Sequence, residues 1–323
     1  MSQRTLVTGA SGFVGHALVS RLVSRDATEV IAMTRMNPGN PVSGAIYRPV
    51  GDLALQMHWP QELAGVDTIV HAAARVHIIN DRSARSVHEF ERVNVTPTLQ
   101  LARHAAAIGV RRFIFLSSIG VNGVQTGVAT AFTEADKPNP HNAYALSKLK
   151  AERGLLEISA VTGLDVVIIR PPLVYGPGVR ANFAALMRAV QGGWPLPLGA
   201  VQNRRSLVAL DNLVDFVLTC IDHPQAANQT FLVSDGQDVS SPELVCGLAR
   251  AAGVPARLVP VPPWVLLSVA SVLGKREFMQ RLCGSLRVDI SKAKTVLGWA
   301  PRISVDEGLR RAVAGLSSEI EIP

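Results

Sequence analysis

Short apolar runs alternate with helical patterns over the first half of the chain. The runs are rich in Val, Ile, Leu and Phe with little polar alternation, which is typical of strands buried on both faces. They cover residues 5–8, 29–33, 68–74, 112–118 and 166–169. Helical periodicity lies between them, for example at Ala17, Leu18 and Leu22, and over 87–108. This order predicts an α/β fold, a Rossmann-type doubly wound parallel sheet.

The pattern changes after Arg170. Residues 170–178 read as a rigid loop, and prolines interrupt the later sequence. Apolar runs at 207–210 and 231–233 predict two short strands, the second returning to the main sheet. We therefore expect two parts, a dinucleotide-binding domain and a smaller C-terminal substrate lobe. The first takes residues 1–170 with 208–238 returning to it, and the second takes 171–207 and 239–323.

Charge and cysteine usage narrow the class of protein. A formal net charge of +7 and a pI near 9.8 favour anionic partners such as phosphorylated small molecules. No dense Lys/Arg run with interleaved aromatic residues is present, so a nucleic-acid partner is not expected. The three cysteines are far apart with no CxxC pair, which argues against disulfides and against a zinc site.

Location follows from the same survey. The N-terminus enters a strand pattern at once, so we expect no signal peptide and a cytoplasmic protein. The apolar stretch 262–273, beside Lys275 and Arg276, is too short to span a bilayer. We expect a buried lobe helix or a homodimer contact there, with a membrane-interface segment as the alternative.

A glycine-rich turn follows the first strand pattern and opens a helix. The spacing is GxxGxxG rather than GxGxxG. Gly9 permits the tight turn, Gly12 lets a pyrophosphate approach the backbone, and Gly15 lets the helix pack against the strand. The residues expected to hold a dinucleotide here are Gly9, Ser11, Gly12, Phe13, Val14 and Gly15.

Three further segments are expected to complete the dinucleotide site. The second strand ends at Thr34 and Arg35, where an NAD-selective site usually has an acidic residue. A guanidinium would pair with a 2′-phosphate, so NADP(H) is favoured and NAD(H) stays open. Asp52 and Leu53, which follow an irregular segment, are placed near the adenine. The small residues Ala72, Ala73 and Ala74 would let the cofactor lie close to the backbone.

Tyr144 and Lys148 stand four residues apart on a predicted helix, so they share one face. An ammonium near a phenol favours the phenolate and lowers its pKa, which suits the phenol to acid–base chemistry at a hydroxyl or carbonyl. A lone YxxxK pattern is weak. Its value depends on the glycine turn and on the hydroxyls Ser117 and Ser118 at the end of another strand.

Together, the glycine turn, His71-Ala72-Ala73, Ser117-Ser118, the YxxxK pair and the 170–178 segment resemble the extended short-chain dehydrogenase/reductases. The likeness is to the branch of nucleotide-sugar epimerases, dehydratases and reductases, and it covers nearly the whole chain. It implies that Tyr144 is the catalytic acid/base, that Ser118 binds the reacting sugar oxygen, and that Lys148 binds the nicotinamide ribose. Ser117 and Pro171 would lie beside the cofactor.

The resemblance also implies a UDP-sugar substrate held by the smaller lobe. Asn182 is placed where a diphosphate-contacting amide is expected, and Leu198 where a residue packs on uracil. Arg205 resembles an arginine that contacts the nucleotide. A second diphosphate arginine is assigned to Arg287, although residues 276 and 281 compete for that role.

Departures from the family pattern select among its reactions. Ile119 and Gly120 replace the acidic pair of the dehydratases, so dehydration is not expected. Asn122 stands where many 4-epimerases keep an aromatic residue. The preferred interpretation is an NAD(P)H-dependent 4-reductase of a UDP-4-keto-6-deoxy-N-acetylhexosamine, serving O-antigen synthesis. The alternative is a UDP-hexose 4-epimerase acting on glucose or N-acetylglucosamine. A non-catalytic dinucleotide sensor is the minor alternative.

Overall fold

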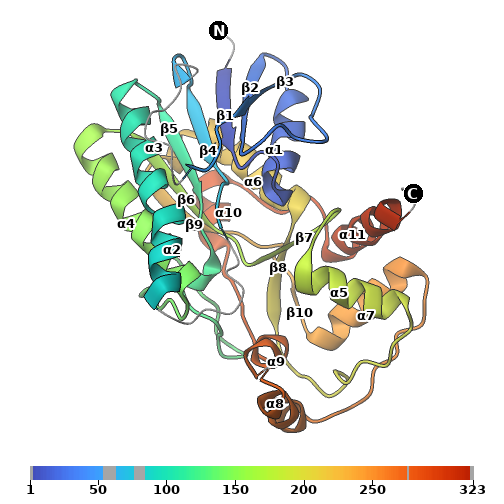
Figure 1. The fold of residues 1–323 in the computed structure, drawn as a ribbon. Coiled ribbons are helices and arrows are strands. Elements are labelled where there is room, and N and C mark those ends of the chain that lie inside the picture. Colours follow the sequence, from blue (N-terminus) through green and yellow to red (C-terminus); the bar gives the residue numbers. More distant parts are fainter. Residues whose placement is uncertain (1–2, 54–62, 76–83, 275, 321–323) are drawn as a thin grey trace.

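Seven parallel strands form the central sheet of the computed structural model, which describes residues 3–53, 63–75, 84–274 and 276–320 (Figure 1). Their order across the sheet is β3-β2-β1-β4-β5-β6-β9. The strands are β1 Gln3–Thr8, β2 Thr28–Thr34, β3 Ala45–Pro49, β4 Thr68–His71, β5 Arg112–Leu116, β6 Asp165–Arg170 and β9 Gln229–Leu232. The predicted Rossmann-type sheet is confirmed.

Helices cover both faces of this sheet. One face packs against α1 Phe13–Val23, α6 Leu210–Asp222 and α10 Ser291–Leu297. The other packs against α3 Thr96–Ala107 and α4 Ala143–Thr162, with α2 Ala84–Asn94 beside α4. Successive strand residues serve opposite faces, since Leu6 joins the second core and Val7 the first. Burial on both sides explains the nearly unbroken apolar runs.

The chain reverses its direction of progress across the sheet between β1 and β4. These strands are neighbours, with Thr8 opposite His71. The segments that follow Thr8 and His71 therefore emerge side by side at the carboxyl edge of the sheet. Open α/β sheets bind their ligands at such a point.

A smaller lobe carries a three-stranded sheet in the order β10-β8-β7. Its strands are β7 Leu173–Tyr175, β8 Arg205–Ala209 and β10 Asp238–Val239. Its helices are α5 Ala181–Gln191, α7 Ser241–Ala252, α8 Pro263–Val272, α9 Arg276–Cys283 and α11 Val305–Ile320. Tyr175, Leu248 and Leu309 are central to its core. Helix α8 lies at the tip farthest from β1 (Figure 1).

Three segments differ from their sequence-based expectations. Residues 45–49 form edge strand β3 instead of an irregular segment, although they are only half-buried and end in proline, which an edge tolerates. The 170–178 segment contains β7 instead of being loop throughout. The 87–108 helical pattern is two helices, because the chain breaks at Val95 ahead of Pro97.

The two apolar runs at 207–210 and 231–233 form strands in different sheets. β9 pairs with β6 at the edge of the main sheet, as expected for 231–233. β8 pairs with β7 in the smaller sheet. The assignment of 171–207 and 239–323 to substrate binding stays a prediction.

Candidate functional site

The glycine turn brings α1 close to the backbone after β4. Gly9 has a φ of +67°, and a Cβ built on it would lie 2.7 Å from the Ala73 nitrogen. A Cβ on Gly15 would lie 2.1 Å from the Gly9 carbonyl oxygen. The turn closes through a 2.9 Å hydrogen bond from the Gly12 amide to the Gly9 carbonyl. The positively polarised N-terminus of α1 thus opens at the sheet edge, which suits a pyrophosphate.

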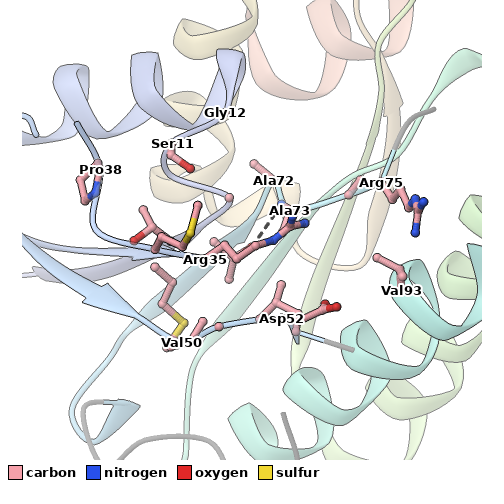
Figure 2. A pocket seen from close by; sticks show the side chains of 18 of the residues that line it. Ser11, Gly12, Arg35, Pro38, Val50, Asp52, Ala72, Ala73, Arg75 and Val93 are labelled. Atoms are coloured by element: carbon pink, nitrogen blue, oxygen red, sulfur yellow. Dashed lines mark hydrogen bonds between the residues drawn. The ribbon is translucent and has the colours of Figure 1, made fainter. Parts of the chain in front are cut away.

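A cleft of about 490 Å³ lies at this edge (Figure 2). In Figure 2, Ser11 and Gly12 lie on one side of Ala72 and Ala73, and Asp52 lies on the other. The cleft is lined by most of the residues predicted to bind a dinucleotide: Gly9, Ser11, Gly12, Arg35, Asp52, Leu53, Ala72, Ala73 and Ala74. Phe13, Val14 and Gly15 form the first turn of α1 behind it.

The lining fits a dinucleotide on its own chemistry. Thr34 is 2 % exposed, lines the cleft, and has a hydroxyl that finds no hydrogen-bond partner within the described part of the chain. A buried hydroxyl of this kind is suited to a ribose hydroxyl. Gly9 and Ala73 leave room for a ligand to reach main-chain atoms. The Arg35 side chain is exposed at the cleft and adds a positive charge.

Helix α4 places Tyr144 and Lys148 one turn apart. The Asn142 side chain caps the helix by accepting a 2.8 Å bond from the Ala145 amide. Lys148 is 2 % exposed, and its Nζ donates a 2.7 Å bond to the Leu116 carbonyl. Burial lowers the pKa of Lys148 to about 7, against a raising influence of the Glu152 carboxylate.

The pKa of Tyr144 differs from its sequence-based expectation. Burial raises this pKa to about 12, whereas we expected Lys148 to lower it. The ring packs edge-on against Phe90 with centroids 6.1 Å apart, and the Lys148 ammonium is held by the Leu116 carbonyl. Tyr144 is therefore poised as a proton donor, and an added positive charge beside it would favour the phenolate.

Ser118 follows β5 and caps the short 3₁₀ helix η3, Ile119–Val121. Its Oγ accepts a 3.1 Å bond from the Gly120 amide, and a hydroxyl that accepts this bond can still donate its own proton. A Cβ on Gly120 would lie 3.3 Å from the Cβ of Ala145, the residue after Tyr144. The turn after Ser118 thus lies against the turn that carries Tyr144.

Ser117 has a structural partner instead of a free hydroxyl. It donates to the buried Glu152 carboxylate, which also accepts bonds of 3.0 and 2.6 Å from the Arg170 guanidinium. Arg170 in turn donates 3.0 Å to the Asn122 side-chain oxygen. This buried network fixes the strand ends on either side of Ser118. Pro171, next in the chain, accepts a 2.9 Å bond from the Ile119 amide.

A second buried network was not predicted from the sequence. The neutral His71 joins the Thr8 and Thr98 hydroxyls through its two ring nitrogens, both at 2.8 Å, and burial lowers its pKa to about 3. Asn94 donates 3.1 Å to Ser147, which lies between Tyr144 and Lys148, and it also bonds the Arg75 backbone at the cleft. These contacts join the cleft to the helix that carries Tyr144. Their members are far apart in the sequence, so no local sequence pattern predicts them.

The four residues predicted to bind the nucleotide part of the substrate lie in or beside the smaller lobe. Asn182 is exposed in the first turn of α5, and Leu198 packs in the lobe core with 4 % exposure. Arg205 donates to the carbonyls of Gly284, at 3.0 Å, and Arg281. Arg287 pairs with Asp238 at 2.6 Å. Their roles toward a substrate stay predictions.

Known proteins similar to this chain include several nucleotide-sugar epimerases. The model of the "NAD dependent epimerase/dehydratase family" matches residues 5–234. A UDP-glucose 4-epimerase from Vibrio cholerae is 44% identical, over 96% of this chain and 94% of the relative. One from Mycolicibacterium smegmatis is 30% identical, over 96% and 97%. The solved UDP-glucuronic acid 4-epimerase from Bacillus cereus, in complex with NAD, covers 99% of this chain and 100% of its own with a TM-score of 0.80 at 21% identity.

Proposed function

Because this chain belongs to the NAD dependent epimerase/dehydratase family, we propose that it is a UDP-hexose 4-epimerase acting on UDP-glucose or UDP-N-acetylglucosamine. The 44% identity to a UDP-glucose 4-epimerase over nearly all of both chains carries this proposal. It revises the preference for a 4-reductase that the sequence suggested. The pair Tyr144 and Lys148 and the hydroxyl of Ser118 supply the acid–base groups that the reaction needs.

Tyr144 and Ser118 handle the proton at the sugar O4. A bound NAD supplies reversible hydride transfer at C4. Ser118 orients the sugar oxygen by hydrogen bonding, and Tyr144 takes the O4 proton on oxidation and returns it on reduction. Since burial raises the pKa of Tyr144 to about 12, the base step needs added positive charge beside the phenol. The Lys148 ammonium, held by the Leu116 carbonyl, does not by itself lower this pKa.

The dinucleotide cleft holds the cofactor in this proposal. Gly12 and the first turn of α1 would bind the pyrophosphate, and Thr34 and Arg35 would contact the adenosine ribose. Asn94 would keep this cleft in register with α4 through its bonds to Arg75 and Ser147. Because epimerisation at C4 leaves the oxidation state of the sugar unchanged, the proposed reaction requires no net oxidant or reductant.

Two observations favour the 4-reductase as a second candidate. Arg35 stands at the end of β2, where its guanidinium could bind a 2′-phosphate, and reductases that consume NADPH need that contact. Asn122 is held by Arg170 and by a 2.9 Å bond to the Thr133 carbonyl, in a place where many 4-epimerases keep an aromatic residue. Dehydration remains disfavoured because Ile119 and Gly120 cannot move a proton.

Incubation with UDP-glucose and with UDP-N-acetylglucosamine, without added cofactor, tests the proposal. Proton NMR is expected to show the C4 epimer accumulating until equilibrium. The control is Tyr144→Phe, which should form the epimer about 10²–10⁴-fold more slowly. If neither sugar is epimerised, but NADPH is oxidised by a UDP-4-keto-6-deoxy-N-acetylhexosamine, the enzyme is a reductase and the epimerase proposal is wrong.

A further inference from the structure

Helix α8 presents an apolar face to solvent at the tip of the smaller lobe (Figure 1). Its sequence, PWVLLSVASV, contains no charged residue. Trp264 is 70 % exposed and Val272 89 % exposed, whereas Leu266 and Ala270 face the core at 7 % and 4 %. The helix expected to be buried in the lobe is therefore buried on one side only. A helix that is apolar all round is usually covered on every side.

The two serines on α8 do not make this face polar. Ser268 donates a 2.9 Å bond to the Trp264 carbonyl, and Ser271 donates 2.7 Å to the Leu267 carbonyl. Both hydroxyls are thus satisfied within the helix, one turn back, and can leave water at little cost. The outer face of α8 accordingly behaves as an apolar surface along its length.

Positive charge borders this surface. Helix α9 packs against α8 and carries Arg276 and Arg281, both with exposed side chains. Phe278, at 39 % exposure, lies between them in the sequence. Lys275, which precedes Arg276, lies outside the described residues. Exposed aromatic and aliphatic side chains beside arginines are the composition of segments that lie in a membrane interface.

We propose that α8, together with Arg276 and Arg281, docks this protein on the surface of an anionic lipid bilayer. Trp264, Val269 and Val272 would enter the boundary between headgroups and acyl chains, and the guanidinium groups would meet lipid phosphates. The described residues contain no helix long and apolar enough to cross a membrane. Docking would therefore be peripheral, since α8 lies at the tip of the smaller lobe, far from β1 (Figure 1).

Charge disfavours a second copy of the chain as the occupant. A two-fold contact uses the same patch on both subunits. Two copies meeting through α8 would bring Arg276 and Arg281 of each subunit toward those of the other. An anionic bilayer instead neutralises these side chains while it covers Trp264 and Val272.

Flotation with vesicles tests the proposal. Wild-type protein is expected to float with vesicles of phosphatidylglycerol and phosphatidylcholine and to stay at the bottom with phosphatidylcholine alone. Val272→Glu places a charge on the docking face, so it should raise the apparent dissociation constant for the vesicles at least about tenfold, the loss expected for one apolar side chain left unburied. Arg276→Gln combined with Arg281→Gln should weaken binding to the anionic vesicles and reduce its salt dependence.

The matched control is Val161→Glu, which changes an 83 % exposed valine on α4. It should float like the wild type. Equal thermal unfolding midpoints and equal NAD binding would show that the variants are folded. The proposal is overturned if the wild type never floats, if Val161→Glu loses binding as fully as Val272→Glu, or if light scattering shows that Val272→Glu converts a dimer to a monomer without any vesicle binding.

Discussion

The ammonium of Lys148 donates a 2.7 Å hydrogen bond to the carbonyl oxygen of Leu116. Leu116 ends β5, and Ser117 and Ser118 follow it at once. The bond therefore ties the helix that carries Tyr144 to the strand that carries Ser118. It also orients the ammonium, whose Nζ lies 4.4 Å from the centre of the Phe115 ring.

Replacing Lys148 with Met should change how stability depends on pH. Burial lowers the pKa of Lys148 from 10.5 to about 7 in the folded protein, so between these values the unfolded chain binds the extra proton. The buried lysine therefore lowers the free energy of unfolding of the wild type at pH 7 and below. This loss of stability disappears as the pH rises toward 10.5. Relative to the wild type, the free energy of unfolding of Lys148→Met should therefore rise by about 4 kcal/mol on going from pH 10 to pH 7.

Urea unfolding of the nucleotide-free protein at several pH values measures this difference. Lys150→Met serves as the control, since Lys150 is exposed on the same helix and forms an ion pair with Glu91. Its unfolding free energy should follow the wild type across the range. A Lys148→Met curve parallel to the wild type would show that Lys148 keeps its ordinary pKa when buried.

Tyr144→Phe should slow proton transfer strongly while leaving the fold intact. A positioned acid–base group contributes about 10²–10⁴-fold to rate, so kcat should fall by that factor with NAD content unchanged. Tyr47→Phe is the matched control, because the Tyr47 hydroxyl accepts a bond from the Val42 amide near edge strand β3. Turnover of UDP-glucose, measured by NMR, checks both variants. Loss of bound NAD from Tyr144→Phe would point to a cofactor-binding role instead.

Local patterns were enough to predict that the glycine turn and the small residues after β4 lie at one cleft. Gly9, Gly12 and Gly15 directly follow a buried strand, and small residues directly follow β4. Because β1 and β4 are parallel neighbours, the segments after them lie close together. The YxxxK pair could also be recognised from local sequence, because its two members are one helical turn apart. Edge strand β3 was missed because it is half-buried and lacks a strong period.

The supporting networks could not be predicted, because their members are distant in the sequence. Asn94 lies 53 residues from Ser147, and Glu152 lies 18 from Arg170. No period connects such positions, and only the packing of α2 on α4 and of α4 on the sheet brings them together. The pKa of Tyr144 was misjudged on similar grounds, since its burial depends on side chains from another helix.

Gly15→Ala should disrupt the dinucleotide turn. The added methyl group would lie 2.1 Å from the Gly9 carbonyl oxygen, so the start of α1 would have to move away from β1. Overpacking of this kind costs about 1–3 kcal/mol, and NAD affinity should fall as well. Gly39→Ala, whose methyl group meets nothing within 4 Å, is the control for stability and should leave the free energy of unfolding unchanged. Urea unfolding and NAD titration measure both.

Arg35 should set how well the enzyme tolerates a 2′-phosphate on its dinucleotide. The side chain is exposed at the cleft, directly after Thr34 and opposite the glycine turn. Arg35→Glu replaces a charge that attracts the phosphate with one that repels it, so NADPH affinity should fall about tenfold or more relative to NADH. Arg103→Glu, at an exposed position on α3, makes the same charge change elsewhere and should leave the ratio unaltered. Fluorescence titration with both reduced nucleotides gives the ratio. An unchanged ratio in Arg35→Glu would mean that this guanidinium does not reach the ribose, and the observation that most favours the reductase would lose its force.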